Sequence, residues 1–418
     1  MVIPLIAGLL AATAAPGAGD SHASVREFIA LMPWDTLREC PGVLTIDEAA
    51  RGMKECGLNL AGMVRGQHLD VCHRHGLRAL VKDPRVSGYD WRNVDPEQVD
   101  RNIRELVAEV GSHPAVFGYY VKDEPSAQEF PGLAVVVKAL AKYAPGKLAY
   151  INLFPDYATI NNADRVGQLG TESYEEYLDR FIESVPTPVV SYDNYSIEKD
   201  YTVRPSYYRN LLSVRRAALE GGRIFWNVVT SNQVRPFRAS PTRASLAFQA
   251  HTTLAAGGRG VAYYTYYTGD DTLPGAGGYA HGPLWNFRPT PTWEYLRDVN
   301  HGVQAWLPVL ARLESTGVYF GPNPPVDGLP ALPGRIVAGV ESDRPTMVGE
   351  FADPKGAAYT MVVNLDLTQE ARALLTLREG FQRPQQILPV RGRAIPLPSE
   401  GLRLEPGGAA LIQTFRKR

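Results

Sequence analysis

The chain has 418 residues and a formal net charge of -1, with 44% hydrophobic and 21% charged residues. A chain of this length can bury a large core, and we expect one domain of barrel size beside a smaller one. The near-zero charge excludes the electrostatic footprint of a nucleic-acid-binding protein or of one that binds an anionic membrane. We therefore expect a ligand that is uncharged or weakly charged.

Residues 1–23 resemble an export signal. The run from Val2 to Ala15 is apolar and small, and Ala12-Thr13-Ala14 or Ser21-His22-Ala23 would suit a signal peptidase, although no Lys or Arg precedes the run. The run is too short to cross a membrane as a helix, and no later segment qualifies. We expect a secreted or periplasmic protein without a membrane span. The sequence does not indicate its oligomeric state.

Three cysteines, Cys40, Cys56 and Cys72, lie close together in the sequence. An oxidising compartment would permit one disulfide, and the predicted pair is Cys56–Cys72 because both residues lie at the ends of consecutive predicted helices. The three thiols lack the clustered histidine spacing of a zinc site, so no metal and no cofactor are expected.

Between residues 27 and 312, short apolar strands alternate with amphipathic helices. The capping box Thr45-Ile46-Asp47-Glu48 and the pairs Asp95-Pro96, Ser240-Pro241 and Thr290-Pro291 indicate helix starts. The predicted strands are Phe28–Pro33, Leu58–Val64, Leu77–Lys82, Val116–Lys122, Leu148–Phe154, Val189–Tyr195, Ile224–Val229 and Val261–Tyr267. Eight βα units in series favour a closed (β/α)8 TIM barrel, with an open doubly wound sheet as the alternative.

The pattern changes after a predicted helix at Pro291–Leu310. Residues 321–334 are rich in proline, and we predict that they bridge the barrel and a second domain. Short alternating strands such as Met347–Phe351 and Tyr359–Asn364 follow this segment. This pattern is typical of a small antiparallel β domain. The predicted organisation is a signal peptide at 1–23, an α/β barrel at 24–315 and a C-terminal β-sandwich-like domain at 316–418.

The fourth predicted strand ends in two adjacent carboxylates and a proline, at Asp123-Glu124-Pro125. Proline cannot donate to a sheet ladder, so the strand stops there. Barrels build active sites at the carboxyl ends of their strands. The residues that we expect to bind substrate at these ends are Asp123, Trp34, Asp35, Asn152, Tyr195, Trp226, Asn227, Tyr264, Tyr266 and, in a later loop, Trp285.

Aromatic rings, carboxylates and amides without a cationic anchor suit a neutral polyhydroxylated ligand. Aromatic faces cover the C–H faces of a sugar ring, while carboxylates and amides bond to its hydroxyls. Hydrolysis of a glycosidic bond requires a protonated acid and an ionised carboxylate. Glu124 is the candidate acid because an ionised Asp123 beside it raises its pKa. Asp193 is the candidate partner because it ends a neighbouring strand on the same face.

The ending at Glu124-Pro125 resembles the Asn-Glu-Pro signature of clan A glycoside hydrolases. The segment Gly282–Trp285, followed by Pro291-Thr292-Trp293-Glu294-Tyr295, is similar to the closing loop and last helix of the family 42 β-galactosidases. This resemblance implies a retaining (β/α)8 enzyme, with Glu124 as acid/base and Asp123 in the place of the asparagine that bonds the sugar 2-hydroxyl. The clan's nucleophilic Glu ends strand seven, whereas Trp226–Asn232 holds no carboxylate. Either strand seven is misaligned, or Asp193 of strand six is the second carboxylate, which we prefer, or the chain is not a standard retaining enzyme; retention and inversion both stay open.

Two other functions stay open at this point. The absent carboxylate on strand seven is consistent with a non-catalytic carbohydrate-binding protein on a degenerate barrel. A metal-dependent hydrolase using Asp123, Glu124 and Asp193 is the third hypothesis, although no His-x-His motif follows the first predicted strand and borderline metals favour imidazole ligands. The fold alone cannot choose among these functions.

Overall fold

The computed structural model describes residues 22–235, 238–269, 278–388 and 393–417. All but the last two residues of the predicted signal peptide lie outside these ranges, so cleavage and export stay predictions. None of the helices within these ranges is long and apolar enough to cross a membrane.

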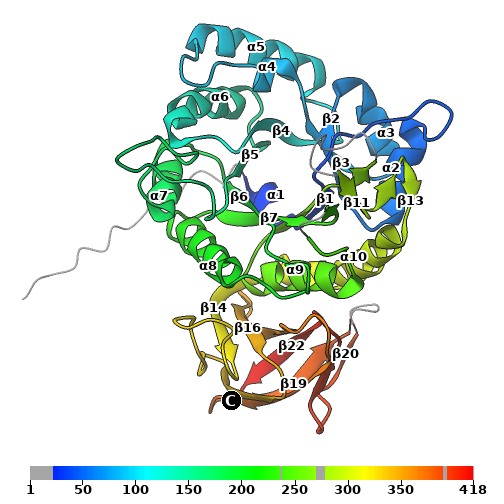
Figure 1. Ribbon diagram of the computed structural model, residues 1–418, viewed down its shortest axis with the longest axis vertical. Helices are drawn as coiled ribbons and strands as arrows, with labels where there is room; N and C mark the ends of the chain where they lie inside the picture. Colours follow the sequence, from blue (N-terminus) through cyan, green and yellow to red (C-terminus); the bar gives the residue numbers. More distant parts are fainter. Residues whose placement is uncertain (1–21, 236–237, 270–277, 389–392, 418) are drawn as a thin grey trace, which may run out of the picture.

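Eight parallel strands form a barrel that Figure 1 shows nearly end-on. Their order around the sheet is β1-β9-β7-β6-β5-β4-β3-β2. The barrel closes between its first two strands, where Asn59 donates from its backbone to Leu31 at 3.0 Å and Met63 donates to Asp35 at 3.1 Å. The strands are β1 (Ala30–Pro33), β2 (Leu60–Val64), β3 (Arg78–Val81), β4 (Val116–Asp123), β5 (Leu148–Leu153), β6 (Val189–Asn194), β7 (Ile224–Thr230) and β9 (Gly260–Tyr264). The predicted TIM barrel is confirmed, and the open sheet is wrong.

Helices cover the outside of this barrel (Figure 1). They are α2 (Ile46–Glu55), α3 (Leu69–Arg74), α4 (Pro84–Ser87), α5 (Pro96–Val110), α6 (Phe130–Tyr143), α7 (Tyr174–Ser184), α8 (Pro205–Glu220), α9 (Arg243–Ala255) and α10 (Pro291–Leu310). The predicted capping box at Thr45 is present, and Thr290 caps α10. The start of α9 differs from the prediction, because Thr242 caps this helix and Pro241 stays outside it.

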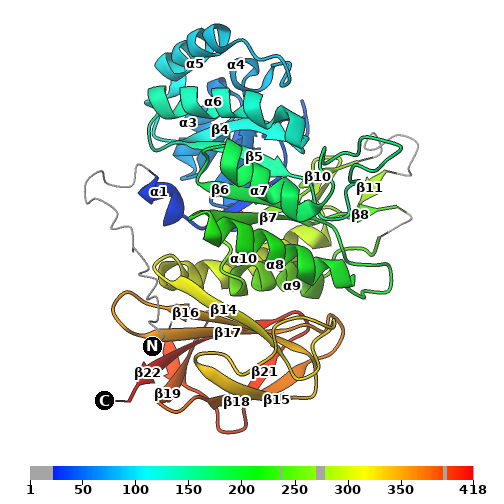
Figure 2. The same cartoon turned by 90° about the vertical axis from the view of Figure 1, so that its left-hand side faces the viewer.

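The short helix α1 (Ala23–Arg26) marks the amino-terminal end of the barrel. Figure 2 shows it on the opposite side of the molecule from the short strands β8 (Gln233–Val234), β10 (Tyr267–Thr268) and β11 (Tyr279–Ala280). These strands follow the carboxyl ends of β7 and β9, so they lie on the face where barrel enzymes place their active sites.

Side chains alternate between the inside of the barrel and the layer under the helices. The inner cluster contains Met32, Leu60, Leu80, Phe117, Tyr150 and Trp226. Gly260 makes room for the largest of them, since a Cβ at that position would lie 2.4 Å from Cγ of Trp226. The barrel interior is thus a packed core, and a site can form only above it.

All three cysteines are free in the structure, which contradicts the predicted Cys56–Cys72 disulfide. Cys56 directs its Sγ toward the backbone oxygen of Trp293, 3.7 Å away. Cys72 is buried between α3 and the sheet, and this burial raises the pKa of its thiol to about 12. Cys56 and Cys72 are close in the sequence but do not pair, because each side chain packs into its own part of the core.

The C-terminal domain is a sandwich of two antiparallel sheets. One has the order β14-β16-β17-β22-β19-β20 and the other β15-β18-β21, with an apolar cluster around Val348, Val362 and Ile412 between them. Their bounds are β14 (Glu314–Gly321), β15 (Val337–Ser342), β16 (Thr346–Ala352), β17 (Ala358–Asn364), β18 (Ala371–Leu377), β19 (Phe381–Ile387), β20 (Ala394–Pro396), β21 (Leu402–Leu404) and β22 (Ala409–Arg416). The predicted small β domain is confirmed. Its proline-rich segment lies between β14 and β15, inside the domain, and so does not bridge the two domains.

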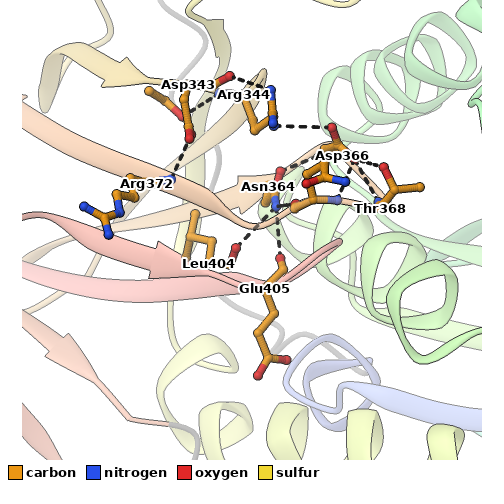
Figure 3. Close-up of polar contacts among 10 residues, drawn as sticks. Asp343, Arg344, Asn364, Asp366, Thr368, Arg372, Leu404 and Glu405 are labelled. Atoms are coloured by element: carbon orange, nitrogen blue, oxygen red, sulfur yellow. Dashed lines mark hydrogen bonds and ion pairs between the residues drawn. The ribbon is translucent and has the colours of Figure 1, made fainter.

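This domain packs against the flank of the barrel, below α8, α9 and α10 in Figure 1. Trp306 donates from Nε1 to the backbone oxygen of Ile387 at 2.8 Å. Burial lowers the pKa of His251 to about 4, so the neutral ring donates from Nδ1 to Gly407, 2.9 Å away. Figure 3 shows how Asn364 fixes the adjoining loop by donating from Nδ2 to the backbone oxygens of Leu404 and Glu405. The bonds of Trp306 and His251 join the two domains along the flank of the barrel, and those of Asn364 hold the β domain's own loop.

Candidate active site

Glu124 lies directly after β4, where the chain turns sharply away from the sheet. Its φ of 44° is in the left-handed region, which costs a non-glycine residue roughly 1–3 kcal/mol. Its backbone N–H donates to Asn152 of β5 at 2.8 Å, and Tyr177 donates from its hydroxyl to the backbone oxygen of Pro125 at 2.7 Å. These two bonds hold a strained turn that presents the Glu124 carboxyl at the barrel mouth.

The carboxyls of Glu124 and Asp193 are in hydrogen-bonding contact. Asp193 is the last residue but one of β6 and is 2% exposed. Its carboxyl accepts a bond from Nδ2 of Asn152 at 2.9 Å, and the same nitrogen donates to Asp123 at 3.1 Å. The ends of three neighbouring strands therefore bring together three carboxyls and one amide, as predicted for adjacent parallel strands.

This crowding disfavours negative charge. Burial, followed by the like charge of Asp123, raises the pKa of Glu124 to about 7, whereas the hydrogen bond with Asp193 acts to lower it. Burial and the charges of Glu124 and Asp123 raise the pKa of Asp193 well above its usual range. The pKa of Asp123 is also raised, mainly by burial. The Glu124–Asp193 pair consequently holds a proton near neutral pH, like two carboxyls that share one site.

An aromatic wall lies beside these carboxyls. Tyr195 follows β6 and stacks on Tyr264 at the end of β9, with ring centroids 5.4 Å apart and planes inclined by 26°. The Tyr264 hydroxyl bonds that of Tyr279 at 2.7 Å, and the Tyr157 hydroxyl accepts from the backbone N–H of Tyr195 at 3.2 Å. Stacked rings next to carboxyls offer the apolar face and the polar edge that a sugar requires.

The structure places two of the predicted substrate-binding residues, Trp226 and Asn227, away from the barrel mouth, one by depth and the other by direction. Trp226 is fully buried in the inner core cluster, where it packs beneath the site against Phe117 and Tyr150. Its neighbour Asn227 points the opposite way and donates to Thr253 of α9 at 3.0 Å. Adjacent strand residues face opposite sides of a sheet, so both could never have lined one site.

Two further predicted residues serve the framework. Asp35 accepts bonds from Thr265 at 2.6 Å and from the Tyr267 backbone at 3.1 Å, which ties the end of β1 to the loop after β9. Tyr266 is buried in the outer core and accepts from Nε1 of Trp293 at 3.0 Å. In this structure both side chains therefore bond to residues of the framework.

The two remaining tryptophans lie at different depths. Trp34 is buried in the inner cluster, with its ring 5.9 Å from Tyr120 and 5.5 Å from Tyr150, and so forms part of the floor below the carboxyls. Trp285 is half-buried on the short strand β12 (Leu284–Trp285), where the Arg235 guanidinium lies 5.7 Å from its ring centroid. It lines a cavity of 460 Å³ at the rim of the strand-end face.

Sequence reasoning missed four residues of this region, which are Tyr150, Ser191, Tyr157 and Tyr279. The first two lie two positions before Asn152 and Asp193 on the same inward face, so period-two counting would have found them. Tyr157 and Tyr279 come from loops after β5 and β9, and no local pattern indicates where a loop tyrosine points. The missed residues supply most of the site's hydroxyls.

The end of β7 carries no carboxylate, as the sequence indicated. Thr230 donates from Oγ1 to the backbone oxygen of Asn232 at 3.1 Å, and Asn232 donates from Nδ2 to that of Tyr264 at 2.9 Å. These bonds occupy the place where the resemblance implies a nucleophile. Within residues 22–235, 238–269, 278–388 and 393–417, no group of three or more His, Cys, Asp or Glu side chains is arranged to hold a metal ion.

Comparisons with known proteins place the fold. No protein-family model and no curated sequence matches the chain. A catalytic mutant of a GH42 β-galactosidase from G. stearothermophilus matches with a TM-score of 0.58 at 8% identity, covering 94% of this chain and 98% of that one. A second structure, described as a glycoside hydrolase, has a TM-score of 0.56 at 10% identity and covers 93% of both chains.

A β-galactosidase from the psychrophilic Marinomonas ef1 matches with a TM-score of 0.52 at 11% identity. The match covers 69% of this chain, which spans 62% of that enzyme's length. At these identities the likeness concerns the fold. The chain shares with these structures a (β/α)8 barrel, here followed by a small β domain.

Proposed function

We propose that the protein is a secreted glycoside hydrolase that cleaves O-glycosidic bonds of a neutral oligo- or polysaccharide, with Glu124 as general acid/base and Asp193 as its partner. The observation that carries the proposal is the hydrogen-bonded pair of carboxyls at the barrel mouth, in which the pKa of Glu124 is raised to about 7. Export rests on the sequence of residues 1–23 alone.

In the proposed reaction, the proton of Glu124 passes to the glycosidic oxygen as the bond to the sugar breaks. The positive charge that develops on the sugar is met by the Asp193 carboxylate, and the same Glu124 then accepts a proton from the incoming water. The stacked rings of Tyr195 and Tyr264 cover the apolar face of the sugar.

The separation of the two carboxyls favours retention of configuration. Hydrogen-bonded carboxyls lie closer than the roughly 5 Å of a retaining pair, and they leave no space for the water that an inverting pair holds across about 6.5–9.5 Å. Glu124 is only half-buried, so its side chain can turn away from Asp193 as the leaving oxygen enters between them. We expect the first product to keep its anomeric configuration, which proton NMR of the fresh reaction mixture would show.

The preference for a neutral substrate follows from the charges. Among the residues that the structure describes, no Lys or Arg forms an ion pair with Glu124 or Asp193. The charges of Lys122 and Lys82 act on Asp123, and Lys122 also pairs with Glu129 at 3.7 Å. An anionic sugar would therefore meet Glu124 and Asp193, which form no ion pair within the described residues, and Asp123, whose charge Lys122 and Lys82 only partly offset.

The test is Glu124→Gln, assayed on neutral polysaccharides and on aryl glycosides. Hydrolysis of natural substrates should fall roughly 10²–10⁴-fold while binding persists. Dinitrophenyl glycosides should retain more activity than natural ones, because their leaving group needs little protonation. The control is Glu109→Gln on α5, an exposed partner of Arg85 that lies away from the site. An equal loss on both substrate types would refute the acid role.

The hydrogen-bonded end of β7 favours one second candidate, a protein that binds carbohydrate without cleaving it. In that case the wild type would bind glycans with Glu124 and Asp193 in place and would release no reducing ends. Prolonged incubation with a broad panel of polysaccharides, followed by a reducing-end assay, separates the two functions.

A further inference from the structure

A cavity of 460 Å³ lies at the rim of the strand-end face, and neither Glu124 nor Asp193 is among the residues that line it. Its walls come from the residue after β8, from β11, from the hairpin of β12 and β13 (Arg288–Pro289), and from the start of α10. Figure 2 shows β8 and β11 together on one side of the barrel. Small-molecule sites commonly enclose about 300–1,000 Å³, so the cavity is large enough for a sugar unit.

The cavity carries positive charge, in contrast to the catalytic pair. The guanidinium groups of Arg235 and Arg288 line it together with the His281 imidazole, and its described lining residues include no Asp or Glu. Among the residues that the structure describes, neither arginine forms an ion pair, whereas Arg238 pairs with Glu198 at 2.8 Å. Nε of Arg235 is buried and has no hydrogen-bond partner there. A buried donor of this kind favours a ligand that accepts hydrogen bonds.

A second contact between an arginine and a tryptophan shows what distinguishes this one. The Arg297 guanidinium lies 5.4 Å from the ring centroid of Trp293, and its charge is met by Glu294. The Arg235 guanidinium lies 5.7 Å from the ring centroid of Trp285 and has no such carboxylate within the described part of the chain. The attraction between a cation and a ring face uses none of the N–H donors of the cation. Arg235 therefore keeps its donors for a ligand beside the ring.

The ring and the apolar walls favour a sugar over a free inorganic anion. Trp285 is half-buried, and Ala280, Pro289 and Pro291 also line the cavity. The C–H face of a sugar packs well on an indole ring, whereas a small anion gains nothing from apolar walls. A carboxylate or sulfate on the same sugar would accept the paired N–H bonds of a guanidinium. An acidic sugar has both of the parts that the cavity matches.

The start of α10 adds a favourable field but no donors. The partial positive charge of a helix N-terminus attracts anions. The first N–H groups are already used, since those of Thr292 and Trp293 donate to Oγ1 and to the backbone oxygen of Thr290 at 3.1 and 3.0 Å, and Pro291 has no N–H. The arginine side chains must therefore supply the hydrogen bonds to an anion.

We propose that this cavity is a second glycan-binding site, in which Trp285 packs on the ring of an acidic sugar unit and Arg235 pairs with its carboxylate or sulfate group. Arg288 of β13 adds a second positive charge. The site goes beyond the proposed function, which concerns the sugar units at the catalytic pair. Binding at the cavity does not depend on hydrolysis.

The strand β11 connects this site to the barrel mouth. The hydroxyl of Tyr279 bonds that of Tyr264 in the aromatic wall at 2.7 Å, and the next residue, Ala280, lines the cavity. Successive residues of a strand face opposite sides, so β11 lies between the aromatic wall and the cavity. A glycan that occupied both would carry an acidic unit beyond the neutral units at Glu124 and Asp193. This extension of the substrate class rests on the proposed function.

The experiment is fluorine NMR of the full chain labelled with 5-fluorotryptophan. The chain has six tryptophans, and Trp285→Phe assigns the signal of Trp285 by its loss. The acidic probes are the methyl glycosides of glucuronic acid, galacturonic acid and galactose 6-sulfate, and the matched neutral probes are methyl glucoside and methyl galactoside. Sodium acetate and sodium sulfate supply the charge without a sugar.

At least one acidic glycoside should shift the Trp285 signal saturably, and should bind more tightly than the neutral glycosides or the free anions. Arg235→Gln should weaken this binding roughly ten-fold or more, because it removes hydrogen bonds to a charged group. Arg235→Lys should weaken it less, since it keeps the charge without the planar fork. The matched control is Arg297→Gln, which removes an arginine from the other tryptophan contact and should leave binding unchanged.

A titration in which no acidic glycoside shifts the Trp285 signal would overturn the proposal, and so would equal binding of the neutral glycosides. Equal binding of acetate or sulfate would show a simple anion site and would refute the sugar. Unchanged binding in Arg235→Gln or, where that variant does not fold, in Arg235→Lys would refute the role of Arg235.

Glu124→Gln separates this site from the proposed function. It should bind the acidic glycosides like the wild type, because Glu124 does not line the cavity. Loss of binding in Glu124→Gln would place the acidic sugar at the barrel mouth and overturn the second site. A protein that binds acidic glycosides at Trp285 but hydrolyses no glycoside would refute the hydrolase and leave the second site standing.

Discussion

The two halves of the barrel mouth differ in the groups they carry. The ends of β4, β5 and β6 place three carboxyls around one amide. The ends of β7 and β9 carry hydroxyls, amides and aromatic rings. Within the described residues, the carboxyl that bonds to the loop after β9 is that of Asp35, which accepts from Thr265 and from the backbone of Tyr267. One half can exchange protons, and the other can cover a sugar face.

The two candidate catalytic carboxyls are therefore placed differently from those that the resemblance to clan A glycoside hydrolases implies. An acid on strand four and a nucleophile on strand seven would lie on opposite halves of the mouth. Here both carboxyls lie on the same half, two strands apart around the sheet, and they touch. Any catalysis must therefore be tested first at β6.

The largest effect is expected from Asp193→Asn. Loss of the carboxylate that faces the developing positive charge should reduce kcat/KM roughly 10²–10⁴-fold, with the fold unchanged because Asn fills the same space. Steady-state kinetics and far-ultraviolet circular dichroism measure the two properties. Activity within a few-fold of the wild type would remove Asp193 from the mechanism and reopen the search on the other half of the mouth.

The second effect concerns stability and compares two tryptophans that were both predicted to bind sugar. Trp226→Ala should lower the free energy of unfolding by about 3–5 kcal/mol, because it empties the packed interior between Phe117 and Tyr150. Trp285→Ala, at a half-buried position on the rim, should cost much less. Urea denaturation measures both, and equal costs would contradict the placement of Trp226 in the barrel core.

The third prediction concerns pH. The general acid must be protonated, so activity should fall as pH rises through about 7, the raised pKa of Glu124. The folded state binds this proton more tightly than the unfolded chain, so the group's contribution to stability is lost as pH rises from about 4.5 to 7. Glu124→Gln cannot titrate, and its melting temperature relative to the wild type should increase across that interval. A constant difference would show that the pKa of Glu124 is not raised in the folded protein.

A smaller effect is expected in the aromatic wall. Tyr195→Ala removes the ring that stacks on Tyr264, and aromatic contacts of this kind contribute about 0.5–1.5 kcal/mol. We expect KM to rise several-fold with little change in kcat, because the ring binds the sugar without moving a proton. A large fall in kcat with an unchanged KM would place Tyr195 among the reacting groups.

The sequence predicted the framework well for physical reasons that are local. Apolar runs bounded by Gly, Pro and capping residues located all eight barrel strands, with ends that differ by at most three residues, as at Tyr267 against Tyr264. Glu124 and Asp193 were brought together as predicted, because parallel strands end at one edge. Their roles in catalysis stay predictions.

The errors arose where long-range contacts decide. Asp35 bonds to Thr265, 230 positions later, and nothing near Asp35 in the sequence indicates that partner. Asn152 was recognised as a polar strand end, but its two carboxyl partners come from other strands. Trp226 and Asn227 were different, since their opposite directions could have been read from strand periodicity alone.

The smallest effect is expected at the end of β7, where the resemblance to clan A glycoside hydrolases implies the nucleophile. Thr230 ends β7, and its hydroxyl is used by the backbone of Asn232. Thr230→Ala should therefore change kcat/KM less than about two-fold. The lost hydrogen bond should lower the free energy of unfolding by roughly 1 kcal/mol. A large loss of activity would mean that the β7 end takes part in catalysis after all, and the division of the barrel mouth into a proton-exchanging half and a sugar-covering half would fail.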